Sequence, residues 1–282
     1  MTSEFTSSLP TEVRQYAIET LHETKENRKR GMQAIKSFAS KNPHLHIRTE
    51  DKYILPYLRN CKFDIEKTKE KLKNFYKMKR DRTELFENRN PHLPELKELA
   101  RMGCFVVLKQ TYKNQAVILS NPTHQDPKHH TLDDFFKLSI MVADITTLES
   151  ELAQIYGYLV IVDMKNTSFE FIKQFSISFM RLAIQVMQTY HCRPQKIAFV
   201  NVPVFVSVVL NMFKAIMPEK MRKRIHVSNN GGSSLKSLID VDMLPEDYGG
   251  KGESLEELGK YWMEKLISYE SWFAEDEKYK AE

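Results

Sequence analysis

The sequence predicts an α/β protein, in which an N-terminal helical bundle precedes a domain built on a mainly parallel sheet. Residues 10–94 carry apolar side chains at helical spacing among many charges, which is typical of amphipathic helices. Two continuously apolar runs, at 157–163 (GYLVIVD) and 196–202 (KIAFVNV), are typical of strands buried on both faces. A helical pattern follows each run, and this alternation predicts βαβ units with right-handed crossovers.

The order of these patterns predicts three parts of the chain. Residues 1–95 form the N-terminal helical domain, residues 96–250 the α/β domain, and residues 251–282 a C-terminal helical tail. In the first part, Asp64 is expected to cap the helix that follows it, because an aspartate side chain accepts hydrogen bonds from free N–H groups at a helix start.

The α/β domain is expected to begin with a hairpin. The β-branched runs CFVVLKQT and QAVILS flank a turn at 112–114 (YKN). Two capping boxes, Thr131–Asp134 and Ser254–Glu257, then mark the starts of helices. The remaining predicted elements are a helix from 131 to about 151, a helix over 169–190, a short strand over 225–228 and a C-terminal helix that begins at 254.

The composition indicates a globular protein rather than a membrane-spanning one. Of the 282 residues, 28% are charged, and no apolar run approaches the roughly 20 residues that cross a bilayer. The N-terminus lacks the features of a signal peptide. Cys61, Cys104 and Cys192 are odd in number and far apart, which favours a reducing cytoplasm over a disulfide framework. The net charge of +5 is mild and gives no indication of nucleic-acid binding.

Residues 203–217 form a predicted helix that is apolar over most of its circumference. Its polar side chains, Ser207, Asn211 and Lys214, fall on one narrow stripe. Two interpretations are open. The helix is either buried in the core, or one face covers a lipid-sized cavity and can also meet a bilayer when the helix swings away.

A basic run directly follows this helix. It is either an ordinary solvated face or a patch for anionic membranes, where each cation contributes on the order of 1 kcal/mol. Placed beside an apolar helix, the run favours the membrane interpretation. Its cations are Lys220, Arg222, Lys223 and Arg224.

Several segments occur in an order that is specific when they are taken together. They are GYLVIVDM (157–164), the run from KIAFVNV to KRIHV (196–227), LIDVDMLPEDYGG (238–250) and SLEELGKYW (254–262). Together they resemble the CRAL-TRIO family, which includes α-tocopherol transfer protein and cellular retinaldehyde-binding protein. The N-terminal segment at 53–79 resembles the small helical domain that precedes the lipid-binding domain in that family.

The resemblance implies a cavity for an apolar ligand, closed by a mobile gate helix at 203–217. It implies a cytoplasmic, transiently membrane-associated protein that transfers a tocopherol-, retinoid- or carotenoid-like lipid between membranes. The alternative is a phosphatidylinositol-binding regulatory module without transfer activity. Neither interpretation requires an enzyme activity or a cofactor beyond the bound lipid.

The resemblance also implies which residues contact the ligand, although ordinary core packing is the alternative for each. Helix periodicity adds Phe179, which shares a face with Phe175 and Ala183. Ser139 is the polar member, and its hydroxyl is expected to bond its own helix carbonyl or a ligand hydroxyl. The predicted ligand-binding residues are Phe136, Ser139, Val162, Phe175, Phe179, Ala183, Val186, Met187, Ile197, Val206, Val209, Leu210 and Phe213.

A second set of positions is predicted to contact the membrane or phosphoinositide head groups. Cys61 and Gln195 stand where the family pattern has further basic residues, which favours a looser attraction to anionic membranes. The predicted contacts are Arg59, Arg193, Lys220, Arg222 and Arg224.

Motifs for catalysis are absent from the sequence. There is no G-x-S-x-G elbow, no P-loop and no G-x-G-x-x-G. The histidine-rich segment 122–131 is expected to be an exposed loop rather than a metal site. Asp163 is expected to form a turn, and so is the segment 229–234.

Overall fold

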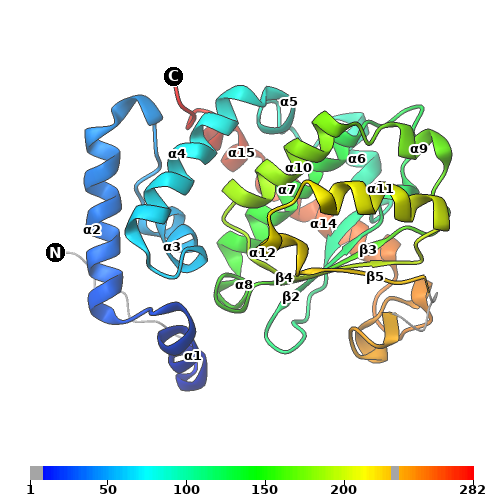
Figure 1. The fold of residues 1–282 in the computed structure, drawn as a ribbon, viewed down its shortest axis with the longest axis horizontal. Helices are drawn as coiled ribbons and strands as arrows, with labels where there is room; N and C mark the ends of the chain where they lie inside the picture. The colour runs from blue at the N-terminus through cyan, green and yellow to red at the C-terminus, as the bar shows by residue number, and fades with distance from the viewer. Residues whose placement is uncertain (1–8, 230–234) are drawn as a thin grey trace.

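The protein has the predicted α/β architecture (Figure 1). The computed structural model describes residues 9–229 and 235–282, so the turn predicted at 229–234 lies, apart from Asn229, outside the described residues. Within these ranges, five strands form one sheet in the order β1-β2-β3-β4-β5. They are β1 (Phe105–Val107), β2 (Ala116–Ser120), β3 (Tyr158–Asp163), β4 (Pro194–Val200) and β5 (Ile225–Val227).

The sheet is mainly parallel, as predicted. Only the pair β1 and β2 is antiparallel, whereas β2–β3, β3–β4 and β4–β5 are parallel. The hairpin between β1 and β2 turns at Lys113 and Asn114, which both have positive φ angles (50° and 65°). Two consecutive residues with positive φ angles are typical of a tight β-hairpin turn, and their presence confirms the predicted hairpin.

The N-terminal part is helical and lies beside the α/β domain in Figure 1 (blue to cyan). The predicted cap is confirmed, because the side chain of Asp64 accepts a hydrogen bond from the Lys67 backbone. The elements are α1 (Thr11–Leu21), α2 (Lys25–Lys41), the 3-10 turn η1 (Pro43–Leu45), α3 (Asp51–Asn60), α4 (Ile65–Asp81) and α5 (Thr83–Phe86). The next helix, α6 (Pro94–Arg101), packs into the core of the α/β domain.

The helices of the α/β domain follow the predicted order, and both capping boxes are confirmed. One predicted helix is divided: the segment 169–190 forms two helices, and the second begins where the Oγ of Ser176 accepts a hydrogen bond from Phe179 N. The helix expected to end near Glu151 ends at Glu149, and a further short helix follows it, capped by the Oγ of Ser150, which accepts a hydrogen bond from Ala153 N. The helices are α7 (Leu132–Glu149), α8 (Glu151–Tyr156), α9 (Phe169–Lys173), α10 (Ile177–Thr189), α11 (Val204–Ala215), α12 (Glu219–Arg222), α14 (Leu255–Ser268) and α15 (Glu270–Asp276). The 3-10 turns are η2 (Pro122–His124), η3 (Val241–Met243) and η4 (Glu246–Tyr248).

The prediction of one helix over 169–190 is therefore wrong. Its residues form α9 and α10, separated at Gln174–Ser176. Serine favours helix starts because its hydroxyl satisfies a free N–H group, and both Ser168 and Ser176 cap the helix that follows them. These caps allow the chain to change direction, so that α10 is the helix that packs on the cavity described below.

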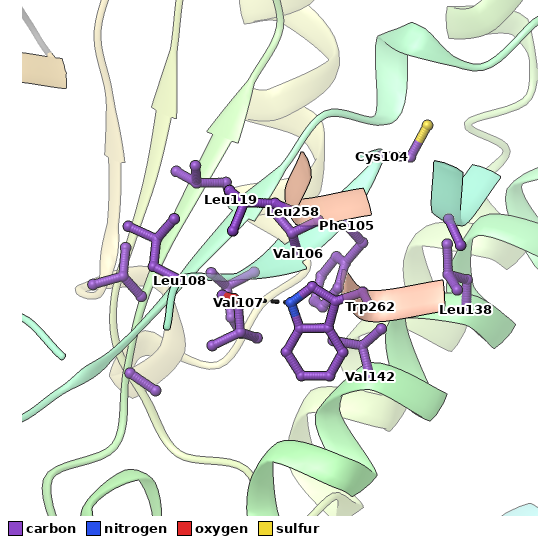
Figure 2. Close-up of a cluster of buried hydrophobic side chains, with 14 of the residues drawn as sticks. Cys104, Phe105, Val106, Val107, Leu108, Leu119, Leu138, Val142, Leu258 and Trp262 are labelled. Carbon is purple, nitrogen blue, oxygen red and sulfur yellow. Dashed lines mark hydrogen bonds between the residues drawn. The ribbon is translucent and has the colours of Figure 1, made fainter. Parts of the chain in front are cut away.

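The C-terminal helix α14 is anchored in the main core of the α/β domain. Figure 2 shows the indole of Trp262 directed at β1, where its Nε1 donates a 2.9 Å hydrogen bond to the Val107 carbonyl. Leu138 and Val142 of α7 pack around the same indole, so this core joins β1, α7 and α14.

The C-terminal tail also packs against the N-terminal helices. In α15, the carboxylate of Asp276 accepts 2.7 Å hydrogen bonds from Lys79 of α4 and from Arg89. Arg89 also donates a 3.0 Å hydrogen bond to Asp144 of α7. The predicted division into three segments remains a prediction, and these buried ion pairs tie all three segments together.

Candidate functional site

A cavity of about 270 Å³ lies between the sheet and the helices α7, α10 and α11. All thirteen residues that were predicted to contact a ligand line this cavity. That they bind a ligand stays a prediction. They are Phe136, Ser139, Val162, Phe175, Phe179, Ala183, Val186, Met187, Ile197, Val206, Val209, Leu210 and Phe213.

Helix α11 covers the cavity with one face. Val206, Val209, Leu210 and Phe213 point into it. The opposite face carries large apolar side chains at i, i+4 spacing that are exposed to solvent. Their exposed fractions are 81% for Val204, 61% for Val208, 49% for Met212 and 42% for Ile216. Of the two interpretations that the sequence left open, the structure matches a helix over a hollow rather than a helix buried on all sides.

Sequence reasoning missed part of the lining, although a signal was present. Side chains alternate between the two faces of a strand, so Val160 and Tyr158 must share the face of Val162 on β3. Both line the cavity. By the same rule Phe199 shares the face of Ile197 on β4, and both line the cavity. The other missed polar members are Ser120, Tyr190 and Cys192.

The hydroxyl of Ser139 is satisfied within its own helix. Its Oγ donates a 2.7 Å hydrogen bond to the Phe135 carbonyl, one turn earlier in α7. This matches the first of the two partners that the sequence predicted. A ligand is therefore not required to satisfy this serine as a donor.

The polar end of the cavity lies where α10 leads into β4. Tyr190 lines the cavity, and its hydroxyl donates to the carboxylate of Asp144 and to the Ile140 carbonyl. Burial, together with the charge of Asp144, raises the pKa of Tyr190 well above its ordinary value. The hydroxyl of Tyr158 lies 2.8 Å from that of Thr147. This end therefore offers neutral hydrogen-bonding groups within an otherwise apolar wall.

The comparison with protein families identifies this architecture. The CRAL/TRIO domain matches residues 100–250, which is more than half of the chain. This chain belongs to the CRAL/TRIO family. A Pinta-like UBA domain matches residues 24–96, immediately before the CRAL/TRIO domain. The resemblance inferred from the sequence is confirmed, and the cavity lies within the CRAL/TRIO domain.

The curated relatives include two clavesins. Clavesin-1 of Xenopus laevis is 28% identical over 206 residues, which cover 72% of this chain and 62% of the relative. Clavesin-2 of Homo sapiens is 25% identical over 233 residues, which cover 82% of this chain and 71% of the relative. The match therefore spans less than two thirds of the length of Clavesin-1.

A solved structure shares the fold of the whole chain. The crystal structure of Sfh5 aligns with a TM-score of 0.56 at 17% sequence identity. The alignment covers 93% of this chain and 99% of Sfh5. The alignment therefore shows a shared fold that includes both the helical region and the CRAL/TRIO domain.

The basic run of the CRAL/TRIO domain is largely exposed beside the cavity. Lys220 and Arg222 lie on the surface of α12, whereas Lys223 pairs with Glu219 at 2.7 Å. Arg224 is half-buried and donates a 2.7 Å hydrogen bond to the Pro194 carbonyl. Of the predicted membrane contacts, Lys220 and Arg222 are therefore the two that the structure leaves on the surface.

Arg59 and Arg193 are not on this surface, in contrast to their predicted role as membrane contacts. The side chain of Arg59 is 1% exposed and contacts Glu23 at 2.8 Å and Glu151 at 2.7 Å. Arg193 is 9% exposed and donates a hydrogen bond to the Ile155 carbonyl. Because a buried guanidinium requires partners, Arg59 joins α3 to α8 and to the loop after α1, and Arg193 joins the residue before β4 to α8.

A lysine that the sequence analysis missed lies near the basic run. Lys71 of α4 donates a 2.9 Å hydrogen bond to the Tyr190 carbonyl. Burial lowers the pKa of Lys71 to about 8, and the nearby charges of Lys220 and Arg224 act in the same direction. No local pattern singles out one lysine among the many on α4, and only packing against the CRAL/TRIO domain distinguishes it.

The remaining candidates have structural partners. His129 pairs with Asp126 at 2.7 Å, and buried His130 pairs with Glu98 at 3.2 Å. Asp163 accepts hydrogen bonds from the Lys165 backbone and from Asn201, which confirms its predicted turn-forming role. Within residues 9–229 and 235–282, no helix has the length and apolar character required to cross a bilayer.

Proposed function

We propose that this protein binds one small hydrophobic lipid in the cavity and transfers it between membranes. The observation that carries the proposal is the hollow beneath α11, a helix whose inner face lines the cavity and whose outer face exposes apolar side chains. Membership of the CRAL/TRIO family supports a lipophilic ligand. The free cysteines fit a reducing cytoplasm.

The cavity wall favours a neutral ligand. Among the described residues, no charged side chain lines the cavity, and its polar groups are hydroxyls and one thiol. A tocopherol-, retinoid- or carotenoid-like molecule suits such a wall, because it has a long apolar body and at most a hydroxyl or carbonyl group. Burial of roughly 400 Å² of apolar ligand surface contributes on the order of 10 kcal/mol before opposing terms.

Release of such a ligand is coupled to contact with a membrane. Water is a poor destination for a hydrophobic lipid, whereas a bilayer offers an alternative partner for the exposed face of α11. We call Val204, Val208, Met212 and Ile216 the outer stripe of α11. Next to it, Phe169 of α9 is 63% exposed and stacks on Phe205 of α11 with a ring distance of 4.5 Å. The outer stripe and Phe169 therefore form one apolar docking surface.

Charge reversal beside this surface tests the proposal. We expect Lys220→Glu with Arg222→Glu to slow lipid transfer between vesicles that contain phosphatidylserine at least tenfold, because both cations lose their attraction to the anionic surface. The affinity for the lipid in solution is expected to stay unchanged. A fluorescent-lipid transfer assay measures the rate, and mass spectrometry of the extracted native ligand identifies the cargo.

The matched control reverses Lys260 and Lys278, two exposed lysines of the C-terminal region. It is expected to leave the transfer rate unchanged. Equal loss of ligand affinity and transfer in the Lys220 and Arg222 variant would reject this division of roles. A wild-type protein that holds a lipid but transfers none would favour the alternative, a phosphatidylinositol-binding regulatory module.

Removal of apolar area from the outer stripe tests the docking surface separately. We expect Val208→Ser with Met212→Ser to weaken binding to phosphatidylserine vesicles roughly 30-fold, since each side chain loses about 1 kcal/mol of burial in the bilayer, about 2 kcal/mol together. Vesicle sedimentation measures the change. The control Ile267→Ser removes a similarly exposed side chain from α14. An equal effect of this control would contradict a specific docking surface.

A further inference from the structure

Three reactive side chains meet at the polar end of the cavity. The Sγ of Cys192, which lines the cavity, lies 3.7 Å from Nδ1 of His191. On the other side of the imidazole ring, Nε2 lies 3.2 Å from Oδ1 of Asp144. A thiol, an imidazole and a carboxylate are therefore aligned in this order, with the thiol at the cavity wall. Binding and release of a lipid require none of these contacts.

The imidazole of His191 lies between Cys192 and Asp144, which both carry a negative charge when ionised. These surroundings favour the protonated form of the imidazole. Burial alone lowers the pKa of His191, but the charge of Cys192 and the hydrogen bonds to Asp144 and Cys192 outweigh it and raise the pKa to about 9. Asp144 is itself held in place by Arg89 at 3.0 Å. The ring of Tyr190 lies against the imidazole with a centroid distance of 4.2 Å. An imidazolium beside a cysteine sulfur is a recurrent arrangement for nucleophilic cysteines.

We propose that Cys192 is a nucleophile that captures an apolar α,β-unsaturated carbonyl compound in the cavity and binds it covalently as a thioether. The proposal rests on the proposed function, because the compound reaches the sulfur by entering the lipid cavity. The reacting carbonyl compound must be long-chain and uncharged, since the wall near the sulfur is apolar apart from hydroxyl groups.

The reaction is a conjugate addition. The Sγ of Cys192 attacks the β-carbon, and a carbon–sulfur bond forms. The electrons of the carbon–carbon double bond move towards the carbonyl oxygen and give an enolate. The proton shared by Sγ and Nδ1 of His191 then moves to the α-carbon, and the carbonyl group is restored. No oxidant, reductant or leaving group takes part, so one equivalent of ligand is retained for each protein chain.

This chemistry matches the groups that are present. Conjugate addition needs a nucleophile and a proton donor, which Cys192 and His191 supply. Cleavage of an ester would in addition require donors aimed at an oxyanion. Asp144 acts as a positioning residue, because it holds the far side of the imidazole ring.

The two other cysteines provide internal references. Cys104 is 0% exposed, and burial raises its pKa to about 12. Burial also raises the pKa of Cys61, which does not line the cavity. Because Cys192 lines the cavity and contacts an imidazole, whereas Cys61 and Cys104 do not line it, a cavity-directed electrophile is expected to discriminate strongly in favour of Cys192.

The test treats the full chain with trans-3-decen-2-one, an apolar unsaturated ketone. Intact-mass spectrometry is expected to show a mass increase of one probe per chain, and peptide mapping to place it on Cys192. Cys192→Ala is expected to abolish the adduct, whereas Cys61→Ala leaves its rate unchanged. His191→Gln is expected to slow adduct formation at least tenfold without changing the affinity for decan-2-one, the saturated analogue that binds only reversibly.

The saturated analogue separates this proposal from the proposed function. If decan-2-one displaces a fluorescent lipid from the cavity while the unsaturated ketone forms no adduct on Cys192, the covalent capture is wrong and lipid binding stands. If neither ketone nor lipid binds and no adduct forms, both proposals fail. Labelling of Cys61 at the rate of Cys192 would also overturn the assignment, because it would show no selection by the cavity.

Discussion

Replacement of Ala183 with tryptophan is expected to abolish lipid binding, with an affinity at least 100-fold below that of the wild type. Ala183 lies on the cavity face of α10 and is 6% exposed. An indole at this position occupies a large part of a hollow of about 270 Å³ and excludes the ligand from it. A 100-fold loss corresponds to about 2.7 kcal/mol of binding free energy. Titration with a fluorescent retinoid or tocopherol analogue measures the effect.

The position of the substitution decides the result. Gln188→Trp places the same side chain on the exposed side of α10, away from the cavity lining, and is expected to leave lipid affinity unchanged. Thermal unfolding of both variants shows whether the larger side chain disturbs the fold. Wild-type lipid affinity in a folded Ala183→Trp protein would mean that the ligand binds somewhere other than this cavity.

Replacement of Asp276 with asparagine is expected to lower the free energy of unfolding by about 3–5 kcal/mol. The carboxylate accepts 2.7 Å hydrogen bonds from Lys79 and from Arg89, which are 1% and 2% exposed. Asparagine keeps the size of the side chain but leaves two buried cations without this counter-charge, and the loss of one partner from a buried ion pair is strongly destabilising. Urea unfolding measures the change.

A surface ion pair on the same helix provides the control. Glu275 pairs with Lys278 at 2.7 Å, and their side chains are 46% and 72% exposed. Because exposed ion pairs contribute little, Glu275→Gln is expected to change the free energy of unfolding by less than about 1 kcal/mol. Similar losses of unfolding free energy in the Asp276 and Glu275 variants would show that the buried ion pairs stabilise the fold no more than an exposed one.

The same carboxylate predicts a response to acid. Burial alone raises the pKa of Asp276, but the charges and hydrogen bonds of Lys79 and Arg89 outweigh it and lower the pKa to about 2. A carboxyl group with a lowered pKa in the folded state stabilises the fold above its ordinary pKa. This contribution, about 2 kcal/mol, is complete above about pH 5 and is lost progressively as the pH falls through about 4 and 2. In Asp276→Asn, this part of the pH dependence is expected to disappear.

Local patterns in the sequence predicted most of the secondary structure, because strands and helix starts depend on neighbouring residues. The apolar runs became β3 and β4, and the capping boxes at Thr131 and Ser254 became the starts of α7 and α14. The break between α9 and α10 was missed, although Ser176 carried a signal for it. Apolar periodicity outweighed that serine in the prediction, because both segments are rich in apolar residues.

The ligand-binding prediction depended on family resemblance, and the fold brought its residues to one place. Periodicity alone shows which residues of a helix share a face, but it does not show whether that face meets a hollow or a packed core. This ambiguity was explicit for residues 203–217. It was resolved by the position of α11 over the space between the sheet, α7 and α10.

The sequence by itself therefore determined the fold class, the family and the order of the elements. The tertiary structure decided which charged and reactive groups are available. Nothing in the sequence distinguishes Arg59 from a surface cation, yet it is buried in the fold beside Glu23 and Glu151. Arg89 and Asp276 are 187 positions apart, and Cys192 reaches Asp144 only through the fold. The physical reason is that burial and pairing depend on contacts between distant segments, which periodicity within one segment does not encode.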